Sequence, residues 1–170
     1  GGVVPYYLSQ IYYETGEIDK LLAVGESLLA QAVASRAAEV AKLIGEGYYQ
    51  KSNWKQAALY LEKHQELGGK LKIQDQYKLG FVLYKTNRHE EAIKAFNKIH
   101  ERGDDLGQSA YYHLADCYLK TGKKTEAQGA FFRASQSGSD LRLREDAYFN
   151  YAKLAYASAT PFEQPLDIFK

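Results

Sequence analysis

The chain has 170 residues, of which 45% are hydrophobic and 25% charged, a composition that excludes disordered and collagen-like proteins. Its 22 basic and 21 acidic residues give a formal net charge of +1, which argues against a dedicated nucleic-acid-binding protein because phosphate contacts require a basic face. No apolar run is long enough to span a bilayer, and the single cysteine, Cys117, excludes an internal disulfide.

Helix is predicted throughout the chain. The three prolines stand at positions 5, 161 and 165, so residues 6–160 contain no proline that would break a helix. No alternation of apolar and polar residues typical of strands occurs. The sequence therefore predicts an all-α fold, with turns near residues 15, 32, 52, 69, 87, 104, 122, 139 and 160.

A repeat of about 35 residues organises this helical chain. Segments 46–64, 81–99 and 116–134 align at a shift of 35 residues without a gap. A small residue precedes each segment, and an alanine follows it twelve positions later. The small residues are Gly45, Gly80 and Ala115, and the alanines are Ala57, Ala92 and Ala127. The predicted repeats cover residues 2–36, 37–71, 72–107, 108–143 and, in part, 144–170, within a single domain.

Each repeat is predicted to form two antiparallel helices. In the third repeat, Leu79 and Leu83 are spaced i, i+4, and Ala92, Phe96 and Ile99 are spaced i, i+4, i+7, so each helix carries one apolar stripe. The turns inside the repeats centre on Gly16, Ser52, Asn87 and Gly122. Polar residues announce the second helices, namely Asn53, Asn87 and Thr125. Glycines at 68–69, 103 and 138 separate consecutive repeats.

These motifs resemble the tetratricopeptide repeat. The pattern L-G-x-x-L at 79–83 is followed by A-x-x-x-F at 92–96, and L-A-x-x-Y at 114–118 by A-x-x-x-F at 127–131. The resemblance implies a right-handed superhelix of antiparallel helix pairs, in which the small residue and the alanine lie where the two helices cross closest. The period of 35–37 departs from the 34 of the family, and the proline near the repeat end is missing.

The first helix of each repeat is expected to line the concave face of such a solenoid. Its residues three before, one after and four after the small residue are then candidates for a partner-binding groove. They are Tyr6, Gln10, Tyr13, Lys42, Glu46, Tyr49, Tyr77, Phe81, Tyr84, Tyr112, Asp116, Leu119, Phe149, Lys153 and Tyr156. Most are aromatic, and tyrosine combines a large contact area with a hydrogen-bonding tip, which suits recognition of a peptide or protein.

Two other uses of such a fold are disfavoured. Pentatricopeptide arrays read RNA, but they need a basic groove that a net charge of +1 does not supply. The chaperone-binding tetratricopeptide proteins hold a terminal carboxylate with lysine, asparagine and arginine. The matching positions here include Glu46, which would repel a carboxylate. A terminal-carboxylate clamp is therefore not expected.

No constellation of residues indicates catalysis. Cys117 lies on a predicted first helix and is expected to be a buried, inert thiol. The histidines are scattered: His64 is expected in helix packing, His89 at a turn, His100 near a helix end and His113 solvated beside the groove. Five basic residues form a mildly basic edge near the turns, namely Lys85, Arg88, Lys120, Lys123 and Lys124. No metal or cofactor is predicted.

The expected function is that of a non-catalytic scaffold that binds a peptide or protein partner in an aromatic-lined concave groove. The alternative is a purely architectural spacer segment of a larger envelope or assembly protein, with no groove ligand. An exposed aromatic strip would favour binding, whereas rings buried between repeats would favour the spacer.

The ends of the chain suggest a larger parent protein. The sequence has no methionine and starts at Gly1, and an incomplete last helix leaves Leu166, Ile168 and Phe169 without a covering repeat, so we expect the array to continue beyond Lys170. Residues 147–169 also resemble arrays in large exported proteins of Bacteroides-type bacteria, which implies a periplasmic or outer-membrane-associated parent.

Overall fold

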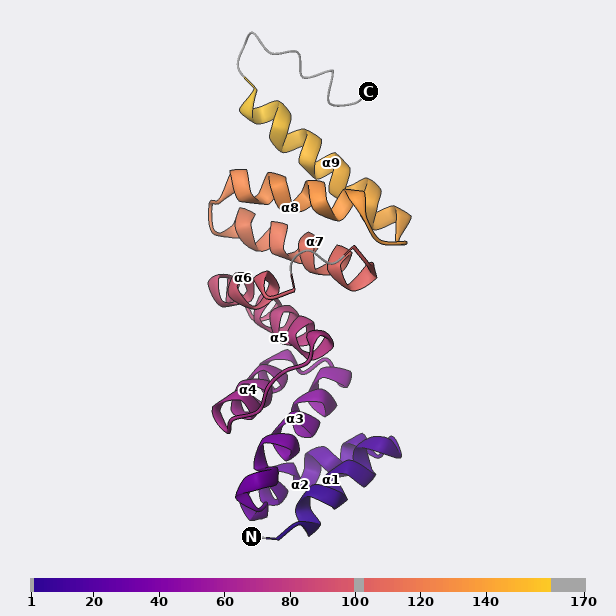
Figure 1. Cartoon of the computed structure of the whole chain (residues 1–170), viewed down its shortest axis with the longest axis vertical. Helices are drawn as coiled ribbons and strands as arrows, with labels where there is room; N and C mark the ends of the chain where they lie inside the picture. The colour runs from indigo at the N-terminus through magenta and orange to yellow at the C-terminus, as the bar shows by residue number, and fades with distance from the viewer. Residues whose placement is uncertain (1, 100–102, 160–170) are drawn as a thin grey trace. The chain divides into compact units, whose positions relative to one another are not determined.

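The computed structural model describes residues 2–99 and 103–159, and these ranges form helices joined by short turns (Figure 1). The helices are α1 (Val4–Glu14), α2 (Ile18–Gln31), α3 (Ala34–Gln50), α4 (Trp54–Glu66), α5 (Ile73–Lys85), α6 (His89–Asn97), α7 (Asp105–Lys120), α8 (Lys124–Gln136) and α9 (Leu141–Ser158). No strand occurs in the described ranges; one isolated bridge joins Gly2 and Ala32. The predicted all-α fold is confirmed.

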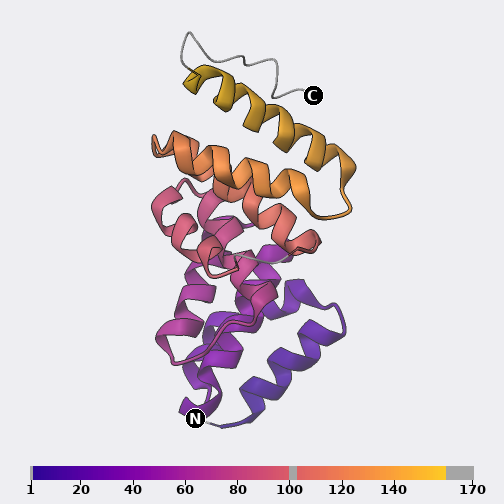
Figure 2. The same ribbon diagram turned by 45° about the horizontal axis from the view of Figure 1, so that its top comes forward.

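Two compact units divide the chain, residues 1–86 and 87–170, and each is described by itself. In unit 1, consecutive helices from α1 to α5 pack on one another, and α1 also contacts α3. In unit 2, α7 contacts α6, α8 and α9, and Figures 1 and 2 both show α7 and α8 side by side. In both units, helices thus pack against their neighbours in the chain. A single domain, the repeat boundaries and a continuation beyond Lys170 stay predictions.

The small residues are buried, and Gly45 lies where its two paired helices approach closely. A β-carbon added to Gly45 on α3 would lie 3.1 Å from the backbone nitrogen and from Cγ of Leu61 on α4. Ala57 and Ala115 are fully buried, and Gly80 is buried as well. The predicted burial of the small residues is therefore confirmed, and Gly45 shows its cause, because a side chain would force the helices apart.

Backbone hydrogen bonds close the turns inside the repeats. The N–H of Glu17, Asn53 and Lys123 each donates to a carbonyl five residues back, at 2.8–2.9 Å. The residue before each donor has a positive φ, as does Asn87 in the remaining turn. In chain order these residues are Gly16 (φ 76°), Ser52 (57°), Asn87 (62°) and Gly122 (77°). The three turns with the described bonds are Schellman motifs.

The predicted helix starters are correct at one position and wrong at two. The Asn53 side chain accepts a hydrogen bond from the Gln56 N–H at 3.3 Å and caps α4. Asn87 instead supplies the positive φ of its turn, and Thr125 lies inside α8, because the turn geometry moves each helix start by one or two residues. The side chains of Asp104 and Asp140 cap α7 and α9.

Replacing Ser52 by glycine is expected to raise the free energy of unfolding by about 0.5–1 kcal/mol. Serine pays a steric cost at a φ of 57° that glycine does not, although glycine loses more entropy on folding. Chemical denaturation of the two proteins measures the difference. The same change at Gln50, the last residue of α3, should lower stability, because glycine there has no compensating positive φ. Equal effects at the two positions would contradict the argument.

Two buried polar side chains hold the linkers where the family proline is missing. In unit 1, the His64 ring is fully buried, its Nδ1 donates to the Ala38 carbonyl at 2.7 Å, and Gly69 lies directly against it. In unit 2, Gln108 exchanges two hydrogen bonds with the Asp140 backbone, at 2.9 and 3.3 Å. Side-chain packing therefore fixes these linkers in place of a restricted φ.

Candidate functional site

The predicted groove residues of unit 1 lie on α1, α3 and α5, and most of them are linked to one another. They are Tyr6, Gln10 and Tyr13 on α1, Lys42, Glu46 and Tyr49 on α3, and Tyr77, Phe81 and Tyr84 on α5. A polar network occupies one part of this row and an aromatic cluster another. The polar network is buried and bonded within the protein, whereas the aromatic cluster is partly exposed.

The polar network is built around two buried carboxyl groups. Glu46 and Asp75 are 7% and 6% exposed and are hydrogen-bonded to each other. Glu46 also accepts a hydrogen bond from the Tyr13 hydroxyl at 2.6 Å and lies 3.5 Å from the Lys78 ammonium. Asp75 lies 3.6 Å from the Lys42 ammonium. Glu46, predicted as a groove residue, is therefore a buried residue that ties α1, α3 and α5 together.

The environment separates the pKa values of the two acids. Burial raises the pKa of Glu46, and its hydrogen bond to Asp75 raises it further. Burial opposes ionisation of Asp75 as well, but the Glu46 hydrogen bond and the Lys42 and Lys78 ammonium groups together lower the pKa of Asp75. Asp75 therefore ionises before Glu46 as pH rises. Burial and the Glu46 carboxylate raise the pKa of Tyr13 to about 12.

The substitution Glu46→Gln is expected to flatten the dependence of stability on pH above 4.5. Because the folded chain binds the Glu46 proton more tightly than the unfolded chain, this contribution is complete below pH 4.5 and is lost as pH rises through the raised pKa. Asp75 acts at lower pH, since its pKa is lowered. Urea denaturation between pH 4.5 and 7 measures the effect. The exposed Glu126→Gln should leave the slope unchanged, and an unchanged slope in Glu46→Gln would contradict the prediction.

The aromatic cluster comprises Tyr49, Trp54, Tyr77, Phe81 and Tyr84, all of them half-buried. Phe81 is its centre, with ring centroids 6.0 Å from Tyr49, 5.2 Å from Trp54, 6.2 Å from Tyr77 and 6.4 Å from Tyr84. The Lys78 ammonium lies 5.6 Å from the Tyr49 ring centroid, and that of Lys85 lies 5.8 Å from the Phe81 centroid. The cluster is a rigid, partly exposed apolar surface flanked by cations.

The remaining predicted groove residues of α1, Tyr6 and Gln10, contact residues of α1 and α3. The Arg36 guanidinium lies 4.8 Å from the ring centroid of Tyr6, whose edge meets Tyr7. Gln10 donates to the Glu14 carboxylate at 3.0 Å, on the exposed side of the helix. The contacts described for Tyr6 and Gln10 thus lie outside the polar network and the aromatic cluster.

In unit 2 the predicted groove residues differ strongly in exposure. The Tyr112 hydroxyl donates to the Asp146 carboxylate, and burial, together with this bond, raises the pKa of Tyr112 to about 12. Phe149 and Tyr156 on α9 are 58% and 60% exposed, and the Lys153 ammonium lies 5.4 Å from the Phe149 centroid. The predicted groove residues Asp116 and Leu119 on α7 are half-buried.

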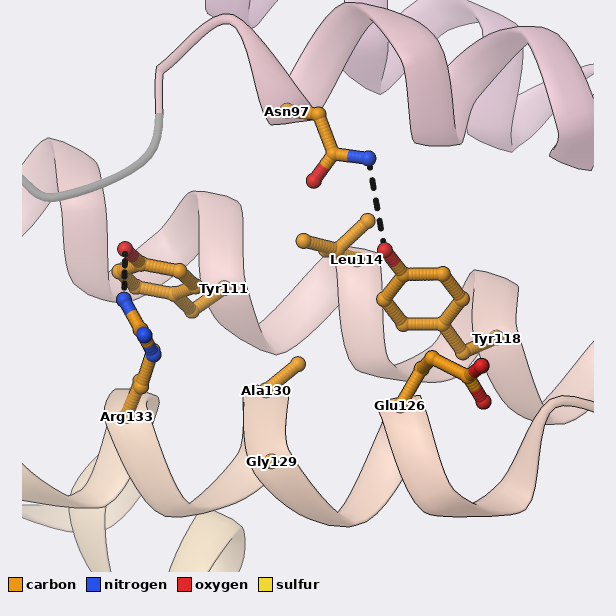
Figure 3. A pocket seen from close by; sticks show the side chains of 8 residues that line it. All are labelled: Asn97, Tyr111, Leu114, Tyr118, Glu126, Gly129, Ala130 and Arg133. Atoms are coloured by element: carbon orange, nitrogen blue, oxygen red, sulfur yellow. Dashed lines mark hydrogen bonds between the residues drawn. The ribbon is translucent and has the colours of Figure 1, made fainter.

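A separate pocket of about 460 Å³ lies among α6, α7 and α8 (Figure 3). Arg133 donates to the Tyr111 hydroxyl at 3.2 Å at one end, and Asn97 donates to the Tyr118 hydroxyl at 3.4 Å at the other. Leu114 lies between the two pairs (Figure 3). None of the predicted groove residues lines this pocket.

The residues considered for catalysis are packed inside the protein. Cys117 is fully buried, as predicted, and burial raises the pKa of its thiol to about 12. His64 is buried in helix packing, which is also confirmed. The prediction of a solvated His113 is wrong, because its half-buried ring stacks on Phe96 with centroids 6.2 Å apart. His100 and the last predicted helix, with Leu166, Ile168 and Phe169, lie outside the described residues.

Charge and metal chemistry can be assessed over the same ranges. The predicted basic edge is partly neutralised, since Lys123 pairs with Glu90 at 3.0 Å and Arg88 with Glu91. Within residues 2–99 and 103–159, no group of three or more His, Cys, Asp or Glu side chains is arranged to hold a metal ion. None of the helices in these ranges has the length and apolar character of a membrane span.

Sequence reasoning missed three residues of this site. Trp54 lies at the start of a second helix, and Asp75 and Lys78 lie five and two positions before Gly80, outside the register that was used to select groove residues. The sequence signal for Asp75 and Lys78 was the presence of an acid and a base in an otherwise apolar first helix, α5. The lone tryptophan beside a turn was the signal for the third.

Comparisons with known proteins support the tetratricopeptide repeat family. The sequence profile of the tetratricopeptide repeat matches residues 76–102 and 109–131. No curated protein matches the chain. The profile match and the helix pairs confirm a tetratricopeptide-like α-α solenoid as the fold class.

Solved structures agree with this assignment. YrrB, described as a TPR protein with an unusual peptide-binding site, is 22% identical over 98% of this chain and 82% of its own, with a TM-score of 0.71, which shows the fold alone. MamA AMB-1 in the P212121 form is 25% identical over 77% of this chain and 69% of its own, with a TM-score of 0.63. The C2221 form of MamA AMB-1 is 26% identical over 79% of this chain and 76% of its own, with a TM-score of 0.62. The resemblance to exported Bacteroides-type arrays stays a prediction.

Proposed function

We propose that this chain is a non-catalytic interaction module that binds a peptide or protein segment along the first-helix face, with no nucleic-acid ligand. Tetratricopeptide proteins generally mediate protein–protein interactions, and the family profile and fold support that class here. The observation that carries the proposal is the aromatic cluster around Phe81, which is partly exposed and preorganised by ring contacts.

The charges on this face determine what kind of contact is available. Glu46 accepts a hydrogen bond from Tyr13 and pairs with Lys78, and Asp75 pairs with Lys42. The polar network therefore already has partners within the protein. Aromatic faces therefore supply most of the affinity, as at the anchor positions of other interfaces. A terminal-carboxylate clamp does not fit this arrangement.

The alternative is an architectural spacer, in which the same rings serve only to pack helices. The half-buried state of the cluster is compatible with packing, whereas the exposure of Phe149 and Tyr156 favours a surface that receives a partner. A binding experiment separates the two functions.

The test is selection of peptides from a random-sequence phage-displayed library on the purified chain. Peptides that bind in the proposed place should lose at least tenfold in affinity for Phe81→Ala and less for Phe81→Leu, which keeps apolar bulk. Leu59→Ala, an exposed apolar residue on α4, is the matched control and should bind normally. Circular dichroism confirms that each variant is folded. Failure to enrich any peptide, or binding that ignores both Phe81 changes, would favour the spacer.

A further inference from the structure

The most accessible chemistry of the aromatic cluster lies at the turn between α3 and α4. Tyr49 is near the end of α3 and Trp54 is the first residue of α4, and the Schellman turn between them holds their rings edge to face. Their centroids are 5.4 Å apart, with planes at 68°. Phe81 packs edge to face against both rings, with its centroid 6.0 Å from that of Tyr49 and 5.2 Å from that of Trp54. This arrangement forms a rigid ledge of two half-buried rings.

The polar tips of this ledge are not used inside the protein. Among the described residues, neither the Tyr49 hydroxyl nor the Trp54 indole N–H has a hydrogen-bond partner, and neither atom is buried. Other tyrosines differ, since the hydroxyls of Tyr13 and Tyr112 are bonded to carboxylates. The ledge therefore presents two available hydrogen-bond donors, one of which, the indole N–H, can only donate.

Donors next to aromatic faces complement one kind of peptide backbone. A polyproline II segment has no internal hydrogen bonds, so its carbonyl groups remain free to accept. Proline has no N–H, so such a segment offers acceptors and apolar rings together. An α-helix differs because its carbonyls are bonded within the helix. The two donors therefore suit a backbone with free carbonyls better than they suit an α-helix.

We propose that Tyr49 and Trp54 bind a proline-rich segment of a partner protein in the polyproline II conformation. Its proline rings pack on the two aromatic faces, and its carbonyls accept hydrogen bonds from the indole N–H and the tyrosine hydroxyl. Because such a segment is already extended when free, little conformational entropy is lost on binding. This inference rests on the proposed interaction function and specifies its partner.

Trp54 is the only tryptophan of the chain, so its fluorescence reports on this site alone. The probe is a proline decamer, titrated into the full chain, with an alanine–serine decamer of the same length as the control peptide. The expected result is a saturable change in emission with the proline decamer and none with the control. An equal response to both peptides, or no response in either fluorescence or calorimetry, would overturn the inference.

Conservative variants then locate the contact. Tyr49→Phe and Trp54→Phe each keep a ring and remove one donor, so each should weaken binding of the proline decamer about three- to tenfold by calorimetry. Tyr7→Phe makes the same change on an exposed tyrosine of α1 outside the cluster and should have no effect. Binding that is unchanged in both cluster variants would place the peptide elsewhere and overturn the assignment.

The outcome also separates this inference from the function on which it rests. If library-selected peptides bind in a Phe81-dependent manner but the proline decamer does not bind, the proline preference is wrong and the interaction function stands. If neither binds, both are wrong.

Discussion

Replacing Gly138 by alanine is expected to lower the free energy of unfolding by about 2–4 kcal/mol. Gly138 has a φ of 87°, which costs any residue with a β-carbon, and the added carbon would lie 2.1 Å from Oε1 and 2.3 Å from Cδ of Gln108. Gln108 cannot move away freely, because it is 1% exposed and bonded to the Asp140 backbone. Thermal or urea denaturation measures the loss.

Gly122→Ala is the matched control for this change. Gly122 lies in the same unit and has a φ of 77°, but a β-carbon there would meet no atom within 4 Å. The Gly122→Ala variant should therefore be destabilised by about 1–2 kcal/mol, from the cost of a positive φ alone. Equal decreases in the free energy of unfolding for the two variants would show that the overlap with Gln108 does not contribute to the destabilisation.

The substitution Gly69→Ala is expected to destabilise the chain by about 1–3 kcal/mol through side-chain overlap alone. Its φ is not in the left-handed region, but an added β-carbon would lie 2.2 Å from Cε1 and 2.4 Å from Nε2 of the His64 ring. That ring is fully buried and held by the Ala38 carbonyl, so relieving the overlap displaces the linker after α4. Urea denaturation of the variant tests this.

Two comparisons identify the cause of the Gly69 effect. Gly129→Ala, at an exposed position of α8 with no atom within 4 Å, should stabilise by up to about 1 kcal/mol through helix propensity. Combining Gly69→Ala with His64→Ala should cost less than the sum of the two changes, because the overlapping ring is gone. Additive losses would rule out the ring as the cause.

Turn positions were predictable from the sequence because their chemistry is local. The four residues expected to reverse the chain, Gly16, Ser52, Asn87 and Gly122, all have a positive φ. The period of 35 located them even where the residue, Ser52, is a poor choice for that conformation. Local composition alone would have missed that turn.

Linker geometry and the polar network were not predictable, because both depend on contacts between residues far apart in the sequence. Gln108 bonds to a backbone 32 residues away, and the Tyr13 hydroxyl bonds to a carboxylate 33 residues away. The repeat pattern placed Tyr13 and Glu46 on first helices but could not show that Glu46 is buried. Groove candidates were also selected from first helices only, which is why Trp54, the first residue of α4, was overlooked.

The bond from Tyr13 on α1 to Glu46 on α3 has a counterpart in unit 2, from Tyr112 on α7 to Asp146 on α9. In each unit one phenolic oxygen fastens a first helix to the next first helix. Solenoids add up the small rotation between consecutive repeats, so an error in one joint is carried through every repeat beyond it. Loss of one such hydrogen bond would therefore displace the far end of the array by a distance that grows with the number of repeats beyond it. Tyr13 and Tyr112 accordingly have a structural role. The number of tyrosines therefore overstates the aromatic surface that is available to a partner.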